Sequence, residues 1–212
     1  MDIFSHAVDY FMRGGPCMWP LLFCSMMALV IGFERLMYYR TSISPDKFVV
    51  DFRETMNELK TKEALAIAEN SKGTAAELAK EMLTMEKADE CLGIRYEAIV
   101  YGKTDRIIDA WEKRINYLEV IVGLSPMLGL LGTITGMIAS FNALNDRLSN
   151  PLAVTAGIGE ALITTVFGLI ISIMGMCIHS YLSSMLKDAT LGINEVADVL
   201  VNIHTIEHHN HI

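Results

Sequence analysis

The stretch SPMLGLLGTITG, residues 125–136, decides the fold class that this sequence predicts. The stretch is almost entirely apolar, yet it contains three glycines and two threonines, and each glycine costs a helix about 1 kcal/mol relative to alanine. Inside a membrane this composition has a use. Lipid is as apolar as leucine, so membrane helices associate by close packing, and small residues let their backbones approach. The stretch therefore predicts a membrane helix that packs against another helix.

Apolar and charged residues are segregated along the rest of the chain. Just over half of the 212 residues are hydrophobic and the mean hydropathy is +0.36, while the formal net charge is -8. A helix needs about 20 residues to cross the hydrocarbon of a bilayer, and three stretches are long enough. The sequence thus predicts an all-α integral membrane protein: three transmembrane helices, a helical cytoplasmic domain, and long second and third helices that extend into the cytoplasm.

The basic residues predict the orientation of these segments. Of the 17 Lys and Arg residues, 13 lie between Arg40 and Arg114, and segments rich in Lys and Arg stay in the cytoplasm. Glu34 and Arg35 are interpreted as anchors at the cytoplasmic interface. The expected order is an amphipathic helix on the periplasmic side (1–15), the first span (16–40), the cytoplasmic domain (41–117), the second span (118–144), a periplasmic loop (145–152), the third span (153–183) and a cytoplasmic tail (184–212).

The cytoplasmic domain has a helical pattern throughout. Ser44 and Pro45 predict a helix start at which the Ser44 hydroxyl is the cap, and Thr74 predicts the cap of a later helix. From Glu86 onward no strong breaker occurs before the second span, which predicts one continuous helix. The sequence contains no phosphate-binding glycine loop, nucleophile elbow or zinc motif. We interpret the domain as a scaffold and expect no enzymatic activity.

Residues that could bind a metal do not form a recognisable site. His204 and His208 share one helical face, but the C-terminal segment is interpreted as a solvated tail. The four cysteines are scattered along the chain and no pair has metal-ligand spacing, so they are interpreted as small packing residues: Cys17, Cys24, Cys91 and Cys177. The sequence therefore predicts no metal and no cofactor.

Small residues on the second and third spans predict that these two helices pack together. They recur at three- and four-residue spacing, which places them on one helical face: Gly129, Gly132, Gly136 and Ser140 on the second span, and Gly168, Ser172 and Gly175 on the third, with Ala161 a little earlier. Thr133 lies about 100° around its helix from Gly132. It is therefore expected to face something other than the third span.

The third span also contains GIGEALITTVFGL, residues 157–169, in which Glu160 is the one carboxylate. Acids within a membrane cost several kcal/mol and generally face a protein interior or a water-filled cavity. Together with the hydroxyls of Thr164 and Thr165, Glu160 suggests an ion path. The other interpretation is that the threonines bond their own helix backbone and that Glu160 extends to the outer surface. The spacing alone leaves both open.

These motifs resemble a known family. SPMLGLLGTITGMIASF (125–141) and GIGEALITTVFGLIISI (157–173) resemble the second and third membrane helices of the ExbB/TolQ branch of the MotA/TolQ/ExbB proton-channel family. PLLFCSMMALVIGFERLMYY (20–39) resembles the first helix, so the resemblance covers about residues 16–185. One departure is that the third helix of this branch usually contains a proline, whereas this chain reads GLIISIMGM. A kink there would have to come from Gly168 or Gly175. The flagellar branch fits less well because it has four spans.

The resemblance implies a homopentamer in the inner membrane that encloses one or more single-span partners of the ExbD/TolR type. Such a motor uses proton motive force to act on a TonB- or TolA-like protein. Thr133 and Thr165 correspond to the pore threonines of the family and Glu160 to its acid near the pore, while the protonated aspartate belongs to the partner.

The alternative function is a non-conducting scaffold that stabilises a partner in an envelope complex. In that case Glu160 and the threonines would only pack helices. A conventional solute transporter fits less well, because three spans provide no inverted-repeat pair with a broken-helix binding site. No nucleic-acid partner is expected.

Overall fold

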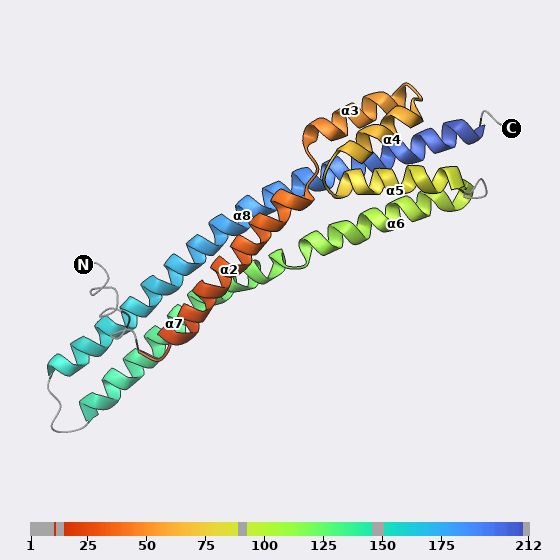
Figure 1. Cartoon of the computed structure of the whole chain (residues 1–212). Coiled ribbons are helices and arrows are strands. Elements are labelled where there is room, and N and C mark those ends of the chain that lie inside the picture. The colour runs from red at the N-terminus through yellow and green to blue at the C-terminus, as the bar shows by residue number, and fades with distance from the viewer. Residues whose placement is uncertain (1–10, 12–14, 89–92, 146–150, 210–212) are drawn as a thin grey trace, which may run out of the picture. The chain divides into compact units, whose positions relative to one another are not determined.

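The computed structural model describes residues 11, 15–88, 93–145 and 151–209, and its regular elements are all helices in these ranges (Figure 1). They are α2 (Met18–Ser42), α3 (Asp46–Asn57), α4 (Thr61–Asn70), α5 (Thr74–Ala88), α6 (Gly93–Glu112), α7 (Ile115–Asn145) and α8 (Pro151–His209). Among the described residues, three helical stretches are long and apolar enough to cross a membrane: Met18–Asn57, Arg95–Asn142 and Gly157–Ile206. They include α2 and most of α7 and α8. The predicted all-helical architecture with three candidate spans is confirmed.

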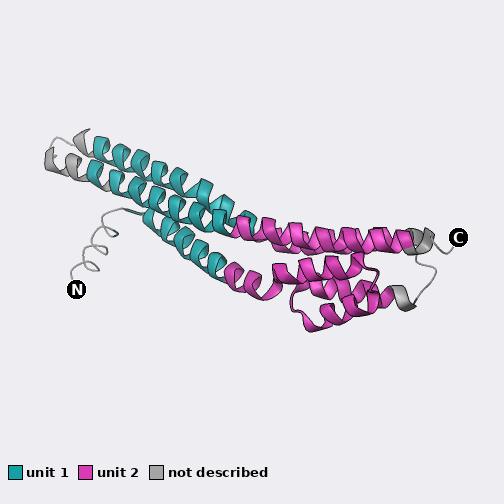
Figure 2. Cartoon of the chain, turned by 90° about the horizontal axis from the view of Figure 1, so that it is seen from above, with its two compact units in different colours: residues 1–33, 115–181 teal, residues 34–114, 182–212 magenta. Residues whose placement is uncertain are grey.

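The chain divides into two compact units, which Figure 2 colours separately. The first unit comprises residues 1–33 and 115–181, and it contains the apolar parts of α2, α7 and α8. Its core is small: Met18, Leu21 and Ile171 are buried, and Cys24, Leu128 and Phe167 pack against them. Many large apolar side chains on these helices are exposed instead, among them Phe33, Met127 and Ile173. Such surfaces are covered by lipid or by other protein.

The second unit comprises residues 34–114 and 182–212. The apolar stripe of α3 is buried through Phe48, Val49, Phe52 and Met56. An ion pair between Arg53 and Glu195 links α3 to α8, and the Tyr101 hydroxyl on α6 donates to Asp198 on α8 at 2.8 Å. The bond to Asp198 is the main reason that the pKa of Tyr101 is raised above its ordinary value. A bond in which the neutral phenol donates thus favours the protonated form of Tyr101.

The predicted helix caps in this unit are wrong, because both hydroxyls have distant partners. The N-cap residue of α3 is Pro45, which makes no side-chain cap bond. The Ser44 hydroxyl accepts from the backbone N–H of Ala76 in the first turn of α5, at 3.3 Å. Thr74 is itself the first residue of α5, and its hydroxyl donates to the Ser42 carbonyl at 2.9 Å. Gly73 makes this crossing possible. Its φ is +110°, and a Cβ there would lie 2.6 Å from the Ser44 backbone.

The prediction of one continuous helix from Glu86 into the second span is also wrong. Glu86 belongs to α5, and a two-residue turn at Lys113 and Arg114 separates α6 from α7. The physical reason lies in α2, whose side chains supply partners where the helix ends. Glu34 forms an ion pair with Arg114, and the buried Tyr39 hydroxyl donates to the Trp111 carbonyl at 2.9 Å. Sequence pattern does not reveal such non-local partners.

The C-terminal part of α8 is packed where the sequence predicted a solvated tail. His204 is 5% exposed, and its ring stacks on that of Tyr96 with 4.2 Å between centroids. The side chain of His208 lies outside the described residues, as do Cys91 and most of the predicted 1–15 helix and 145–152 loop. Among the residues that the structure describes, no group of three His, Cys, Asp or Glu could hold a metal ion.

Candidate functional site

The candidate site is the pair of apolar helices α7 and α8, which approach each other through glycines. A Cβ placed at Gly132 would lie 2.5 Å from Cγ2 of Thr164, and one at Gly136 would lie 2.8 Å from Cβ of Ala161. Real Cβ atoms are essentially never found that close to another heavy atom. Only glycine therefore permits this spacing between the two helices.

Glycines of α8 make the matching approach from the other side. A Cβ at Gly168 would lie 2.6 Å from the backbone oxygen of Ser125, and one at Gly175 would lie 3.0 Å from Cγ2 of Val122. Gly157 lies against Ser140, whose hydroxyl donates to Gly136 in its own helix at 2.9 Å. The small residues that the sequence singled out are thus at the α7–α8 contact.

Two hydrogen bonds cross between the helices. The Thr165 hydroxyl donates to the backbone oxygen of Gly129 at 2.9 Å, and the Ser172 hydroxyl donates to the backbone oxygen of Val122 at 2.8 Å. In a membrane, side-chain bonds of this kind contribute about 0.6 kcal/mol on average and up to about 1.7 kcal/mol. They also fix which residues of the two helices lie opposite each other.

The four residues predicted to line an ion path occupy different environments. Thr164 is 1% exposed and packs against Gly132, and Thr165 bonds α7 as described. Thr133 is half-buried, and its hydroxyl donates to the Leu130 carbonyl of its own helix at 2.7 Å. Glu160 belongs to α8, but its side chain lies outside the described residues. The structure of one chain therefore places two of the threonines at the contact between its helices, and the ion path stays a prediction.

The sequence interpretation missed Pro126. This residue lies inside α7, where a proline removes a backbone hydrogen bond. Ser125, next to it, is fully buried and donates to the Ile121 carbonyl at 2.7 Å. The Ile121 carbonyl is not the one that Pro126 frees, which belongs to Val122, four residues before the proline. The signal that could have identified this position was available, because a proline inside an apolar span leaves that carbonyl in need of another donor.

Arg35, interpreted as an interface anchor, is instead buried at 5% exposure. Its Cζ lies 5.0 Å from the centroid of the Tyr38 ring, which is a cation–π distance. Among the residues that the structure describes, its Nε and Nη1 atoms have no hydrogen-bond partner. Arg35 belongs to the second unit, together with the Glu34–Arg114 ion pair.

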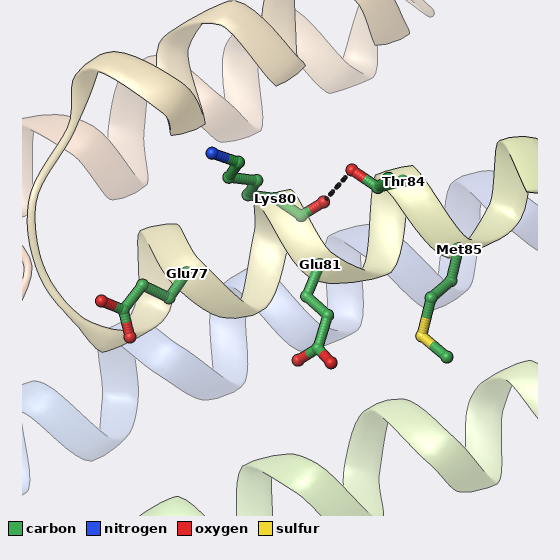
Figure 3. Close-up of a pocket in the computed structure, with 5 residues that line it drawn as sticks. All are labelled: Glu77, Lys80, Glu81, Thr84 and Met85. Atoms are coloured by element: carbon green, nitrogen blue, oxygen red, sulfur yellow. Dashed lines mark hydrogen bonds between the residues drawn. The ribbon is translucent and has the colours of Figure 1, made fainter.

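A surface depression of about 440 Å³ lies along one face of α5 (Figure 3). It is lined by Glu77, Lys80, Glu81, Thr84 and Met85. The Thr84 hydroxyl is engaged with the Lys80 carbonyl at 2.7 Å, and Glu81 pairs with Lys103. These polar groups thus have partners within the chain, and nothing in the arrangement resembles a catalytic or ligand site.

Comparisons with known proteins agree with the fold. Residues 72–195 match the model of the family described as "MotA/TolQ/ExbB proton channel family". The chain is 33% identical over 183 residues to "Putative biopolymer transport protein ExbB-like 1" of Synechocystis sp., which covers 84% of this chain and 71% of the relative. It is 25% identical to "Putative biopolymer transport protein ExbB homolog" of Methanothermobacter thermautotrophicus, over 89% of this chain and 67% of the relative. A shorter match, 36% identical over 41% of this chain and 42% of the relative, is to "Tol-Pal system protein TolQ" of Haemophilus influenzae.

Proposed function

Because the chain belongs to the MotA/TolQ/ExbB proton channel family, we propose that it is the ring-forming subunit of a motor in the bacterial inner membrane. Five copies surround one or more single-span partners of the ExbD/TolR type. Proton flow rotates the partner relative to the ring. The partner then transmits mechanical work to a TonB- or TolA-like protein in outer-membrane transport or envelope maintenance. The periplasmic N-terminus and the cytoplasmic C-terminus are part of this proposal.

The observation that carries the proposal is the extent of the family match, which includes all of α7 and the apolar part of α8. The exposed apolar side chains of these two helices support it. Met127 and Leu130 on α7 and Leu162 and Val166 on α8 are each more than half exposed in the single chain. In the proposed assembly these side chains are covered by neighbouring copies, by the partner helix or by lipid.

Hydroxyl chemistry suggests how the threonines act in such a motor. A hydroxyl has one proton to donate and two lone pairs that accept. The protons of Thr133 and Thr165 are engaged with the carbonyls of Leu130 and Gly129, so both oxygens act as acceptors toward a third group. An acceptor favours the protonated form of a carboxyl group. We therefore propose that these threonines stabilise the protonated aspartate of the partner while it passes the ring.

Proton uptake by liposomes that contain the chain and its partner tests this function. Thr133→Val should reduce uptake several-fold while the assembled complex keeps its mass. Thr135→Val is the matched control, because the exposed Thr135 lies two positions away on α7. Its hydroxyl bonds the Leu131 and Gly132 carbonyls of its own helix and contacts the Cys17 sulfur at 3.9 Å. Assembly of the wild-type complex without any proton uptake would support the non-conducting scaffold instead.

We propose that the negative charge of Glu160 attracts protons toward the partner, and a separate variant tests this role. If its carboxylate attracts protons toward the partner, Glu160→Gln should lower proton uptake strongly while assembly is preserved. If it mainly bridges neighbouring subunits by hydrogen bonds, the amide replaces most of them and uptake survives. In that second case Glu160→Ala should impair assembly, because unsatisfied buried partners cost about 1 to 3 kcal/mol each. Wild-type uptake in the Gln variant would refute the charge role.

A further inference from the structure

Pro126 creates a specific problem in the middle of α7. In an α-helix each backbone N–H donates to the carbonyl four residues earlier, and proline has no N–H. The residue whose carbonyl loses its donor is Val122, since Pro126 lies inside the helix. No water reaches the bilayer core, so membrane helices tolerate such a proline only where another group satisfies the freed carbonyl.

Ser172 is that group. Its hydroxyl, on α8, donates to the Val122 backbone oxygen at 2.8 Å. The neighbouring glycines allow the approach: Gly168 and Gly175, about one turn to either side of Ser172, meet Ser125 and Val122 at distances that leave little or no room for a Cβ. The carbonyl that Pro126 frees on α7 therefore lies opposite a hydroxyl donor on α8, and glycines on both sides of that donor let the two helices come close.

The bond to Val122 also combines with the one between Thr165 and Gly129. The two donors are seven residues apart on α8 and the two acceptors are seven residues apart on α7. Seven residues correspond to about two helical turns, so both bonds lie on the same face of each helix. Together they restrict sliding and rotation of α8 against α7, whereas a single bond would leave α8 able to pivot.

We propose that Ser172 is a positioning residue. By satisfying the carbonyl that Pro126 frees, it sets the register and rotation of α8 against α7, and so holds Thr165 at Gly129 on the face shared by the two bonds. It does not itself need to contact the ion or the partner. Its effect on proton movement rests on the proposed function, but the hydrogen bond and its dependence on Pro126 do not.

A double-mutant cycle tests the pairing, with the thermal stability of the purified full-length protein in detergent as readout. Ser172→Ala should lower the Tm by about 2 to 4 °C, because it also leaves the Val122 carbonyl without a donor in an apolar surrounding. In the Pro126→Ala background the backbone N–H of residue 126 takes over the Val122 carbonyl. There Ser172→Ala should change the Tm by less than about 1 °C.

Ser140→Ala is the matched control. Ser140 is buried in the same contact between α7 and α8, but its hydroxyl bonds the Gly136 carbonyl of its own helix. Because it lies fourteen residues from Pro126, its loss should shift the Tm equally in both backgrounds. If Pro126→Ala does not fold, the ¹³C chemical shift of the Val122 carbonyl provides the second measurement. That shift should move upfield in Ser172→Ala and stay unchanged in Ser140→Ala.

Equal effects of Ser172→Ala in both backgrounds, or an unchanged Val122 carbonyl shift, would overturn the proposal. A functional readout separates it from the proposed function. With a partner present, Ser172→Ala should lower proton uptake by liposomes, and Ser140→Ala should lower it less. If the wild-type complex takes up no protons, the proposed function fails, while the stability cycle still decides whether Ser172 pairs with the carbonyl freed by Pro126.

Discussion

The glycines of α7 lie in different environments, which depend on the face of the helix that each one occupies. Gly132 faces Thr164 across a contact that admits no Cβ, whereas Gly123 on the same helix has no atom within 4 Å of an added Cβ. The same residue type is thus required at one position and dispensable at another. Sequence spacing places Gly132 on one face with Gly129, Gly136 and Ser140, and in the structure these four residues lie against α8.

Gly132→Ala should therefore destabilise the protein. The added methyl group would meet the β-branched side chain of Thr164, which is itself buried. Overpacking of this kind costs about 1 to 3 kcal/mol, and we expect a lower Tm and a lower yield of assembled complex in detergent. Gly123→Ala is the control and should leave stability unchanged or raise it by up to about 1 kcal/mol. Equal Tm values for the two variants would contradict the packing role of Gly132.

At the scale of elements, helix ends are decided by groups far away in the sequence. The N-terminus of α5 receives its acceptor from Ser44, which lies before α3. The end of α6 receives a donor and an ion-pair partner from α2, through Tyr39 and Glu34. Since sequence motifs for capping assume a local partner, they placed the Ser44 cap on the wrong helix and missed the turn at 113–114.

Gly73→Ala should disrupt the start of α5. Its φ of +110° is unfavourable for any residue with a Cβ, and the added atom would also meet the Ser44 backbone. We expect a loss of at least about 1 to 3 kcal/mol, measured by thermal unfolding. Gly102→Ala in α6 is the control, because a Cβ there has no neighbour within 4 Å, and it should be neutral or stabilising. A tolerated Gly73→Ala would show that this crossing is not fixed as described.

Tyr39→Phe should loosen the end of α6. The substitution removes the hydroxyl that donates to Trp111 while keeping the buried ring. The expected loss is about 0.5 to 1.5 kcal/mol, together with faster amide hydrogen exchange at 111–114. Tyr38→Phe is the matched control, since the Tyr38 ring is 40% exposed. Unchanged exchange in Tyr39→Phe would mean that the turn at 113–114 forms without this bond.

At the scale of the whole molecule, the orientation in the membrane is the prediction that most needs a direct test. Asn57 is an exposed residue at the end of α3, in the domain predicted to be cytoplasmic. In a background without the native cysteines, Asn57→Cys should react with a membrane-impermeant maleimide only after the cells are permeabilised. A cysteine replacing Ser149, in the loop predicted to be periplasmic, should react in intact cells. The reverse pattern would refute the orientation that the distribution of Lys and Arg predicts.

The sequence by itself determined the helical class, the number of spans, the family and the glycine face between α7 and α8. These depend on local properties, namely the length of apolar runs, the spacing of small residues and two short motifs. Only the tertiary structure decided that Ser172 serves the carbonyl freed by Pro126, that Ser44 caps α5, that a turn ends α6 at 113–114, and that Thr164 and His204 are buried. The physical reason is that each of these depends on a partner far away in the sequence, or on burial by other helices. The periodicity of a single helix carries no information about either.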